Sequence, residues 1–135
     1  MANLLYDKGR EAFLDGGISW SSDDIRVILV DTDDYTIDSA THDNLDDVPA
    51  GARVATSGAL TGKTVAAGVA DGDDVTFTSV TGDQSEAIII YQHTGVESTS
   101  KLIAYIDTAT NLPVTPNGGD ITIQWDNGAN KIFKL

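Results

Sequence analysis

The pattern of apolar and polar positions changes once along the chain. Between Leu4 and Leu14, leucine, alanine and phenylalanine are mixed with charged residues, and Gly16-Gly17 follows. This pattern predicts one short helix that stops at the glycines, because glycine readily adopts the left-handed conformation that closes many helices. After residue 17, short runs of β-branched and aromatic residues are separated by Gly, Asn, Asp and Ser. These runs predict strands throughout the rest of the chain.

Short runs after residue 17 have the length and composition of strands. The predicted strands are Ile25–Asp31, Ala52–Thr56, Lys63–Ala66, Val75–Val80, Ala87–His93, Lys101–Asp107, Ile121–Trp125 and Lys131–Leu135. We therefore expect an all-β fold, a β-sandwich or jelly-roll-like barrel of about eight short strands with one short N-terminal helix. The Asn127-Gly128 step predicts a tight hairpin between the last two strands, because both residues tolerate positive φ angles.

The chain is expected to form a single domain. It has 135 residues, and no internal repeat, low-complexity tract or linker divides it. Within that domain, residues 1–17 are interpreted as a helical segment or arm, and residues 18–135 as the β-sandwich.

Some of the predicted strands are apolar on both faces. They contain the runs Val27–Val30, Ala87–Tyr91 and Leu102–Ile106, so something must cover each side. An opposing sheet covers one side, but a helix of about ten residues is only ~15 Å long and shields little of the other. Either that helix provides local cover, or neighbouring subunits complete it. We expect the second arrangement, a homo-oligomer, because a broad apolar patch on a monomer usually marks an association surface.

Charge and composition narrow the classes of function. The 21 acidic and 8 basic residues give a net charge of −13, which would repel a phosphate backbone, so we expect no nucleic-acid partner. No apolar run approaches the ~20 residues that span a bilayer, and the N-terminus lacks a signal-peptide pattern, so no membrane association is expected. The absence of cysteine removes disulfides, thiolate nucleophiles and cysteine metal sites.

Motifs for catalysis or cofactor binding are missing. The two histidines, His42 and His93, have no motif context, and the Gly-x-Ser-x-Gly elbow is absent. The segment Ser57–Thr64 superficially resembles a phosphate-binding loop, but three residues separate its glycines where four are needed, and no helix clearly follows. We therefore expect no enzymatic activity and no cofactor.

The strongest local anomaly is the acidic segment of residues 31–47, which contains seven aspartates and neither lysine nor arginine. Oxygen ligands at Asp31, Asp33 and Asp34 make a weak candidate calcium site, because Ca²⁺ takes six to eight oxygens. The twelve-residue EF-hand arrangement with its terminal glutamate is absent. Solvated loop carboxylates are therefore the favoured interpretation, and no metal is assigned.

Carbohydrate chemistry offers two further interpretations. Two facing carboxylates are needed for glycoside hydrolysis, but so acidic a chain will bring some pair to that distance by chance. Trp20, Tyr35 and Trp125 are the aromatic candidates for stacking on sugars in a carbohydrate-binding module. Core packing is the commoner fate of such residues, particularly Trp125, which shares its phase with Ile121 and Ile123.

Several stretches of the chain resemble small virion proteins of tailed bacteriophages and prophages. These stretches are Tyr6–Leu14, Ile25–Asp31, Val48–Val54 and Gly118–Gly128. They are patterns of strands and turns without a catalytic signature. The resemblance implies a capsid decoration (cement) protein, a β-rich module that is often trimeric. Such a protein is made in the host cytoplasm, binds the major capsid protein on the outer surface of the head and stabilises the shell.

No functional residue can be carried over from that resemblance, so contact residues are sought in the sequence itself. Leu4, Leu5, Tyr6 and Phe13 are the candidates, because apolar side chains in the N-terminal segment can dock onto a partner or else cap the sandwich. Deletion of residues 1–14 distinguishes docking from capping. The alternatives in function are a head-fibre, neck or tail component, or a carbohydrate-binding β-sandwich module.

Overall fold

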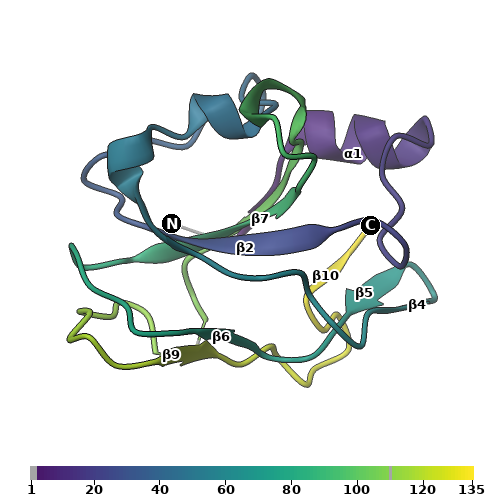
Figure 1. Cartoon of the computed structure of the whole chain (residues 1–135). Helices are drawn as coiled ribbons and strands as arrows, with labels where there is room; N and C mark the ends of the chain where they lie inside the picture. The colour runs from purple at the N-terminus through teal and green to yellow at the C-terminus, as the bar shows by residue number, and fades with distance from the viewer. Residues whose placement is uncertain (1–2, 110) are drawn as a thin grey trace.

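The computed structural model describes residues 3–109 and 111–135 and consists mostly of antiparallel strands (Figure 1). The largest sheet has the order β1-β8-β7-β2-β3, with bounds β1 Leu4–Leu5, β2 Ile25–Val30, β3 Arg53–Thr56, β7 Ala87–Gln92 and β8 Leu102–Ile106. Two smaller sheets contain β10 Phe133–Lys134, β5 Val69–Asp71 and β4 Thr64–Ala66, and β6 Val75–Phe77 with β9 Ile121–Ile123. With one short helix, α1 Asp7–Leu14, this architecture confirms the expected all-β class.

The elements lie in three layers, with the five-stranded sheet in the middle. Figure 1 shows β2 and β7 in the middle layer, with α1 and the short helical turns Leu45–Asp47 and Ala50–Ala52 on one side. The two smaller sheets lie on the other side, so the strands form a sandwich-like arrangement. Because side chains alternate along a strand, β2, β7 and β8 each contribute to two separate cores.

The first core lies between the five-stranded sheet and the smaller sheets. Val27 and Leu29 of β2 point into it, and Phe77 of β6 and Ile123 of β9 pack from the opposite side. All four are at most 2% exposed. Apolar and polar residues alternate in β6 and β9: Thr76 is exposed and Thr122 is half-buried, and each lies between buried residues.

The second core lies on the other face of the sheet and is covered from within the chain. Ile28 and Val30 point into it, and Tyr35, Leu45 and Val48 of the segment between β2 and β3 pack over them. None of these five residues is more than 8% exposed. Both apolar faces of the central strands are therefore buried in a single chain, one by the smaller sheets and the other mainly by the segment between β2 and β3. The sequence-based argument that a neighbouring subunit must complete the cover loses its basis.

The N-terminal segment differs from the prediction in one respect. Leu4 and Leu5 form the short strand β1, which pairs with Tyr105 and Ala104 of β8, and the helix starts only at Asp7. The predicted glycine stop is confirmed. Gly16 has a φ of +84°, and the N–H of Gly17 donates to the carbonyl of Ala12, which closes the helix in a Schellman arrangement.

The predicted hairpin at Asn127-Gly128 is wrong. The strand before it, β9, pairs with β6, and the strand after it, β10, pairs with β5. The two-residue hairpin is instead formed by Ala67 and Gly68, with φ of +53° and +79°, between β4 and β5. Strand β5 was not predicted, because Ala67 is an unusual residue for a turn that needs positive φ at both central positions.

Candidate functional site

The candidate calcium ligands Asp31, Asp33 and Asp34 follow directly after β2. Asp31 is only 7% exposed, whereas Asp33 and Asp34 are exposed. The backbone N–H of Asp33 donates to Oδ1 of Asp31 over 2.9 Å, and that of Asp34 donates to the Asp31 carbonyl over 3.2 Å. Asp33 does not belong to the group of neighbouring carboxylates that contains Asp31 and Asp34.

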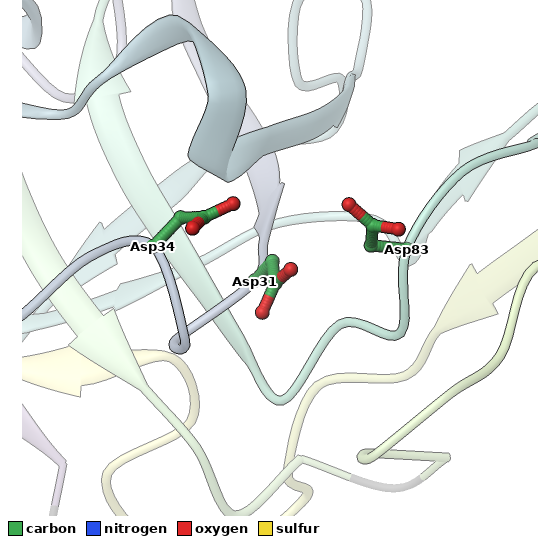
Figure 2. A group of neighbouring side chains, drawn as sticks. All are labelled: Asp31, Asp34 and Asp83. Carbon is green, nitrogen blue, oxygen red and sulfur yellow. The ribbon is translucent and has the colours of Figure 1, made fainter.

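The structure brings Asp31 and Asp34 together with Asp83, which lies in the connection between β6 and β7 (Figure 2). One carboxylate oxygen from each residue lies within 4.8 Å of the others. Sequence reasoning missed Asp83, because no local spacing signals a partner about fifty residues away. Three carboxylates supply only part of the six to eight oxygens that Ca²⁺ requires, so the arrangement assigns no metal.

A second group of acids, Asp43, Asp46 and Asp47, has a structural role. Oδ2 of Asp47 accepts the backbone N–H of Asp43 over 2.7 Å and that of Asn44 over 3.4 Å. Partial burial opposes ionisation of Asp47, but these donated hydrogen bonds outweigh it and lower the pKa of its carboxyl below the usual 3.8. The ionised Asp47 therefore holds the start of the helical turn Leu45–Asp47.

Both histidines have tyrosine hydroxyls as partners. Nδ1 of His42 lies 2.8 Å from the hydroxyl of Tyr35, and Nδ1 of His93 lies 3.3 Å from that of Tyr91. Burial raises the pKa of Tyr35 to about 12, so its hydroxyl is protonated at neutral pH. These contacts hold the histidine rings in position. They do not form an activated nucleophile.

The aromatic residues considered for sugar stacking are buried. Trp20, Tyr35 and Trp125 are 4%, 5% and 8% exposed, so their rings are packed mainly in the interior. The indole N–H of Trp20 donates to the carbonyl of Asp71, and that of Trp125 donates to the carbonyl of Asp73. The carbohydrate-binding alternative thus loses the residues on which it was based.

The four N-terminal candidates lie in different environments. Tyr6 is fully buried, with its hydroxyl 2.9 Å from that of Tyr35, so it cannot reach a partner while the fold is intact. Phe13 is half-buried and packs against Phe133, with ring centroids 6.0 Å apart. Leu5 is half-buried, and Leu4 is 36% exposed. Leu14, which sequence reasoning did not select, is 83% exposed.

A groove of about 790 Å³ lies beside β1. Its walls are two edge strands, β1 of the five-stranded sheet and β10 of the three-stranded sheet. The apolar part of the lining is formed by Leu4, Leu5, Ala104, Ile106, Ala109, Trp125, Ile132 and Phe133. The polar part is formed by Asn3, Thr108, Gln124, Asp126, Asn127, Asn130, Lys131 and Lys134. Sequence reasoning missed this groove, because its lining comes from several separate segments.

Two comparisons with known proteins found no match. No protein-family model matches the chain, and no curated protein matches it. Within the part of the chain that the structure describes, no helix combines the length and apolar character needed to cross a bilayer. The resemblance to phage virion proteins therefore stays a prediction.

Proposed function

We propose that this chain is a non-enzymatic structural protein of a tailed-phage virion, a capsid decoration protein that binds the major capsid protein on the outer head surface. The resemblance of its strand-and-turn segments to small virion proteins supports this function. The net charge of −13 is consistent with it, because an acidic surface tolerates solvent but would be repelled by packaged DNA.

The observation that carries the capsid contact is the exposure of Leu14. This residue ends α1 and is 83% exposed, the highest value among the large apolar residues that the structure describes. Its side chain therefore contributes little to the stability of the single chain and is free to pack against another protein. Among the described residues of the N-terminal segment, Leu4, at 36%, is the other exposed large apolar residue.

A decoration protein of this kind stabilises the shell by mass action. A ligand that binds the assembled lattice and not its dissociated subunits favours assembly by its difference in affinity. Because the lattice repeats the same site many times, a modest affinity at each site adds up over the whole head. Catalysis is not required for this function.

The proposal is tested by adding purified protein to particles that lack it and imaging them by electron microscopy. Ordered density at lattice axes of the head supports a decoration role. Density confined to the neck, tail or fibres contradicts it and favours the alternative of a structural component at that position.

Variants at exposed apolar residues test the contact. We expect Leu14→Ser to weaken binding to the head, with Val65→Ser as the matched control, because Val65 is 60% exposed and lies on β4, outside the N-terminal segment. Equal binding by the two variants would show that Leu14 makes no contact. Deletion of residues 1–14 is unsuitable, since it removes the buried Tyr6 and strand β1.

Self-association into a trimer is part of the same proposal. It now rests on the resemblance alone, because β2, β7 and β8 are covered within one chain. Light scattering over a range of protein concentrations tests it, and a monomer of 14.2 kDa at all concentrations contradicts it.

A further inference from the structure

We propose that the groove between β1 and β10 binds an extended peptide segment that carries carboxylates. Its volume of about 790 Å³ lies within the range of ligand sites, which is roughly 300 to 1,000 Å³. Its lining of both apolar and polar side chains suits a ligand with both kinds of side chain. The inference concerns this surface alone and does not depend on the capsid role.

The walls of the groove favour a peptide because both are sheet edges. Leu5 pairs with Ala104, while the N–H of the next residue, Tyr6, donates to the carbonyl of Ile103. In an antiparallel ladder this places Leu5 at a position where its N–H points away from β8. Such an outward-facing backbone group on an edge strand is available to an added strand.

The opposite wall has the same property. Lys134 pairs with Val69, while the N–H of Leu135 donates to the carbonyl of Gly68. The same alternation directs the N–H and carbonyl of Lys134 away from β5. A peptide lying in the groove therefore meets unused backbone groups from two sheets. Between them, the side-chain amides of Asn127 and Asn130 can pair with further peptide groups.

Charge decides the chemistry of the peptide. Lys131 and Lys134 line the groove, and Asp126 is the acidic residue among its lining residues. Within the described residues, no carboxylate lies within ion-pair distance of either lysine. In a chain with a net charge of −13, two lysines without an ion pair and one aspartate give this lining a local excess of positive charge. Carboxylates on the peptide complement it.

The test uses peptides of seven residues in which valine alternates with glutamate, glutamine or lysine, and measures their affinity by fluorescence polarisation. We expect the glutamate peptide to bind most tightly and its affinity to fall with added salt. On ¹⁵N-labelled protein, the amide signals of Leu5 and Lys134 should shift on binding. Equal affinity for the glutamate and lysine peptides, or shifts confined to other parts of the chain, would overturn the proposal.

Matched variants locate the site. We expect Lys131→Gln combined with Lys134→Gln to weaken the glutamate peptide about ten-fold, as expected for two partly exposed charge pairs. Lys101→Gln is the control, because Lys101 also has no carboxylate within ion-pair distance among the described residues and lies outside the groove. An equal loss of peptide affinity in the double variant and in Lys101→Gln would contradict binding in the groove.

A glycan array separates the other ligand class. Binding of acidic glycans together with failure of every peptide would overturn the proposal in favour of a carbohydrate site. None of these measurements involves capsids. A negative result in the peptide tests therefore does not bear on the decoration function, and a failure to bind capsids does not bear on the peptide proposal.

Discussion

The hydroxyl of Tyr6 lies 2.9 Å from the hydroxyl of Tyr35 inside the second core. Tyr6 precedes α1, and Tyr35 belongs to the segment that covers the central sheet. The Tyr35 hydroxyl is also 2.8 Å from Nδ1 of His42, so three residues form one hydrogen-bonded chain. This chain fastens the acidic segment to the start of the helix. Because buried hydroxyls need hydrogen-bond partners, loss of these hydrogen bonds should lower the free energy of unfolding.

We expect Tyr35→Phe to lower the free energy of unfolding by about 1–3 kcal/mol, because it leaves the buried hydroxyl of Tyr6 without a partner. Tyr6→Phe should cost less, since Tyr35 retains His42. Urea denaturation of both variants and the double variant measures the coupling, and the combined cost should be smaller than the sum.

Tyr105→Phe is the control for the tyrosine variants. Tyr105 is 4% exposed, and its hydroxyl has no protein partner among the described residues. Its loss should therefore change stability less than the loss of the Tyr35 hydroxyl. Strictly additive costs of Tyr6→Phe and Tyr35→Phe would contradict the coupled chain.

We expect Asp47 to make a pH-dependent contribution to the stability of the folded protein. The pKa of this carboxyl is lowered in the folded protein, so its stabilisation is present above the usual value of 3.8 and is lost as the pH falls through the folded-state pKa. Asp47→Asn should cost about 1 kcal/mol at pH 7, as for the loss of a capping interaction. The difference from the wild type should shrink below about pH 4.

Asp46→Asn is the control for that experiment. Asp46 belongs to the same acidic group but is exposed, so its neutralisation removes charge without removing a cap. Thermal melts of both variants across pH 2.5 to about 7 check the expectation. An Asp47→Asn defect that persists unchanged at the lowest pH would show that ionisation is not its cause.

The close packing of α1 on β8 predicts an unusual effect at Gly9. Replacing a helical glycine by alanine normally stabilises a helix by up to about 1 kcal/mol. At Gly9, however, the added Cβ would overlap the carbonyl oxygen of Leu102 and lie 3.1 Å from Cα of Ile103. We expect Gly9→Ala to destabilise the protein by about 1–2 kcal/mol, measured by chemical denaturation.

Gly51→Ala provides the matched glycine control. No atom beyond its neighbours lies within 4 Å of a Cβ built at Gly51, and its φ is not positive. Its stability should stay within about 0.5 kcal/mol of the wild type. A Gly9→Ala protein as stable as Gly51→Ala would mean that the helix moves away from β8 without cost.

Repulsion among the carboxylates of Asp31, Asp34 and Asp83 predicts a stabilising substitution. We expect Asp83→Asn to raise the free energy of unfolding by about 0.5 kcal/mol at low salt, and less at 1 M salt, where charges are screened. Asp33→Asn is the control, since Asp33 lies outside the group. The melts are made in chelator and repeated in excess Ca²⁺.

The calcium arm of this experiment can contradict the repulsion argument. If Ca²⁺ raises the thermal midpoint of the wild type and not that of Asp83→Asn, the carboxylates act as ligands. Equal midpoints of the wild type with calcium and with chelator support repulsion between solvated carboxylates.

Local sequence patterns were sufficient for most of the strands. The run Ala87–His93 predicted β7 to within one residue, because apolar β-branched residues favour extended backbone wherever they are buried. Gly16 likewise marked the end of α1 through its left-handed conformation. The hairpin predicted at Asn127-Gly128 was wrong, because a residue pair that tolerates a turn does not determine which strands pair across it.

The sequence by itself determined the fold class and the presence of two apolar faces on the central strands, because periodicity is a local property. Only the tertiary structure decided what covers those faces. The segment between β2 and β3 folds back over the sheet through Tyr35, Leu45 and Val48, and the seven aspartates in its residues 31–47 give no sign of this. The approach of Asp83 to Asp31 and the groove between β1 and β10 were likewise decided by packing, since each brings together residues whose separation in sequence carries no signal.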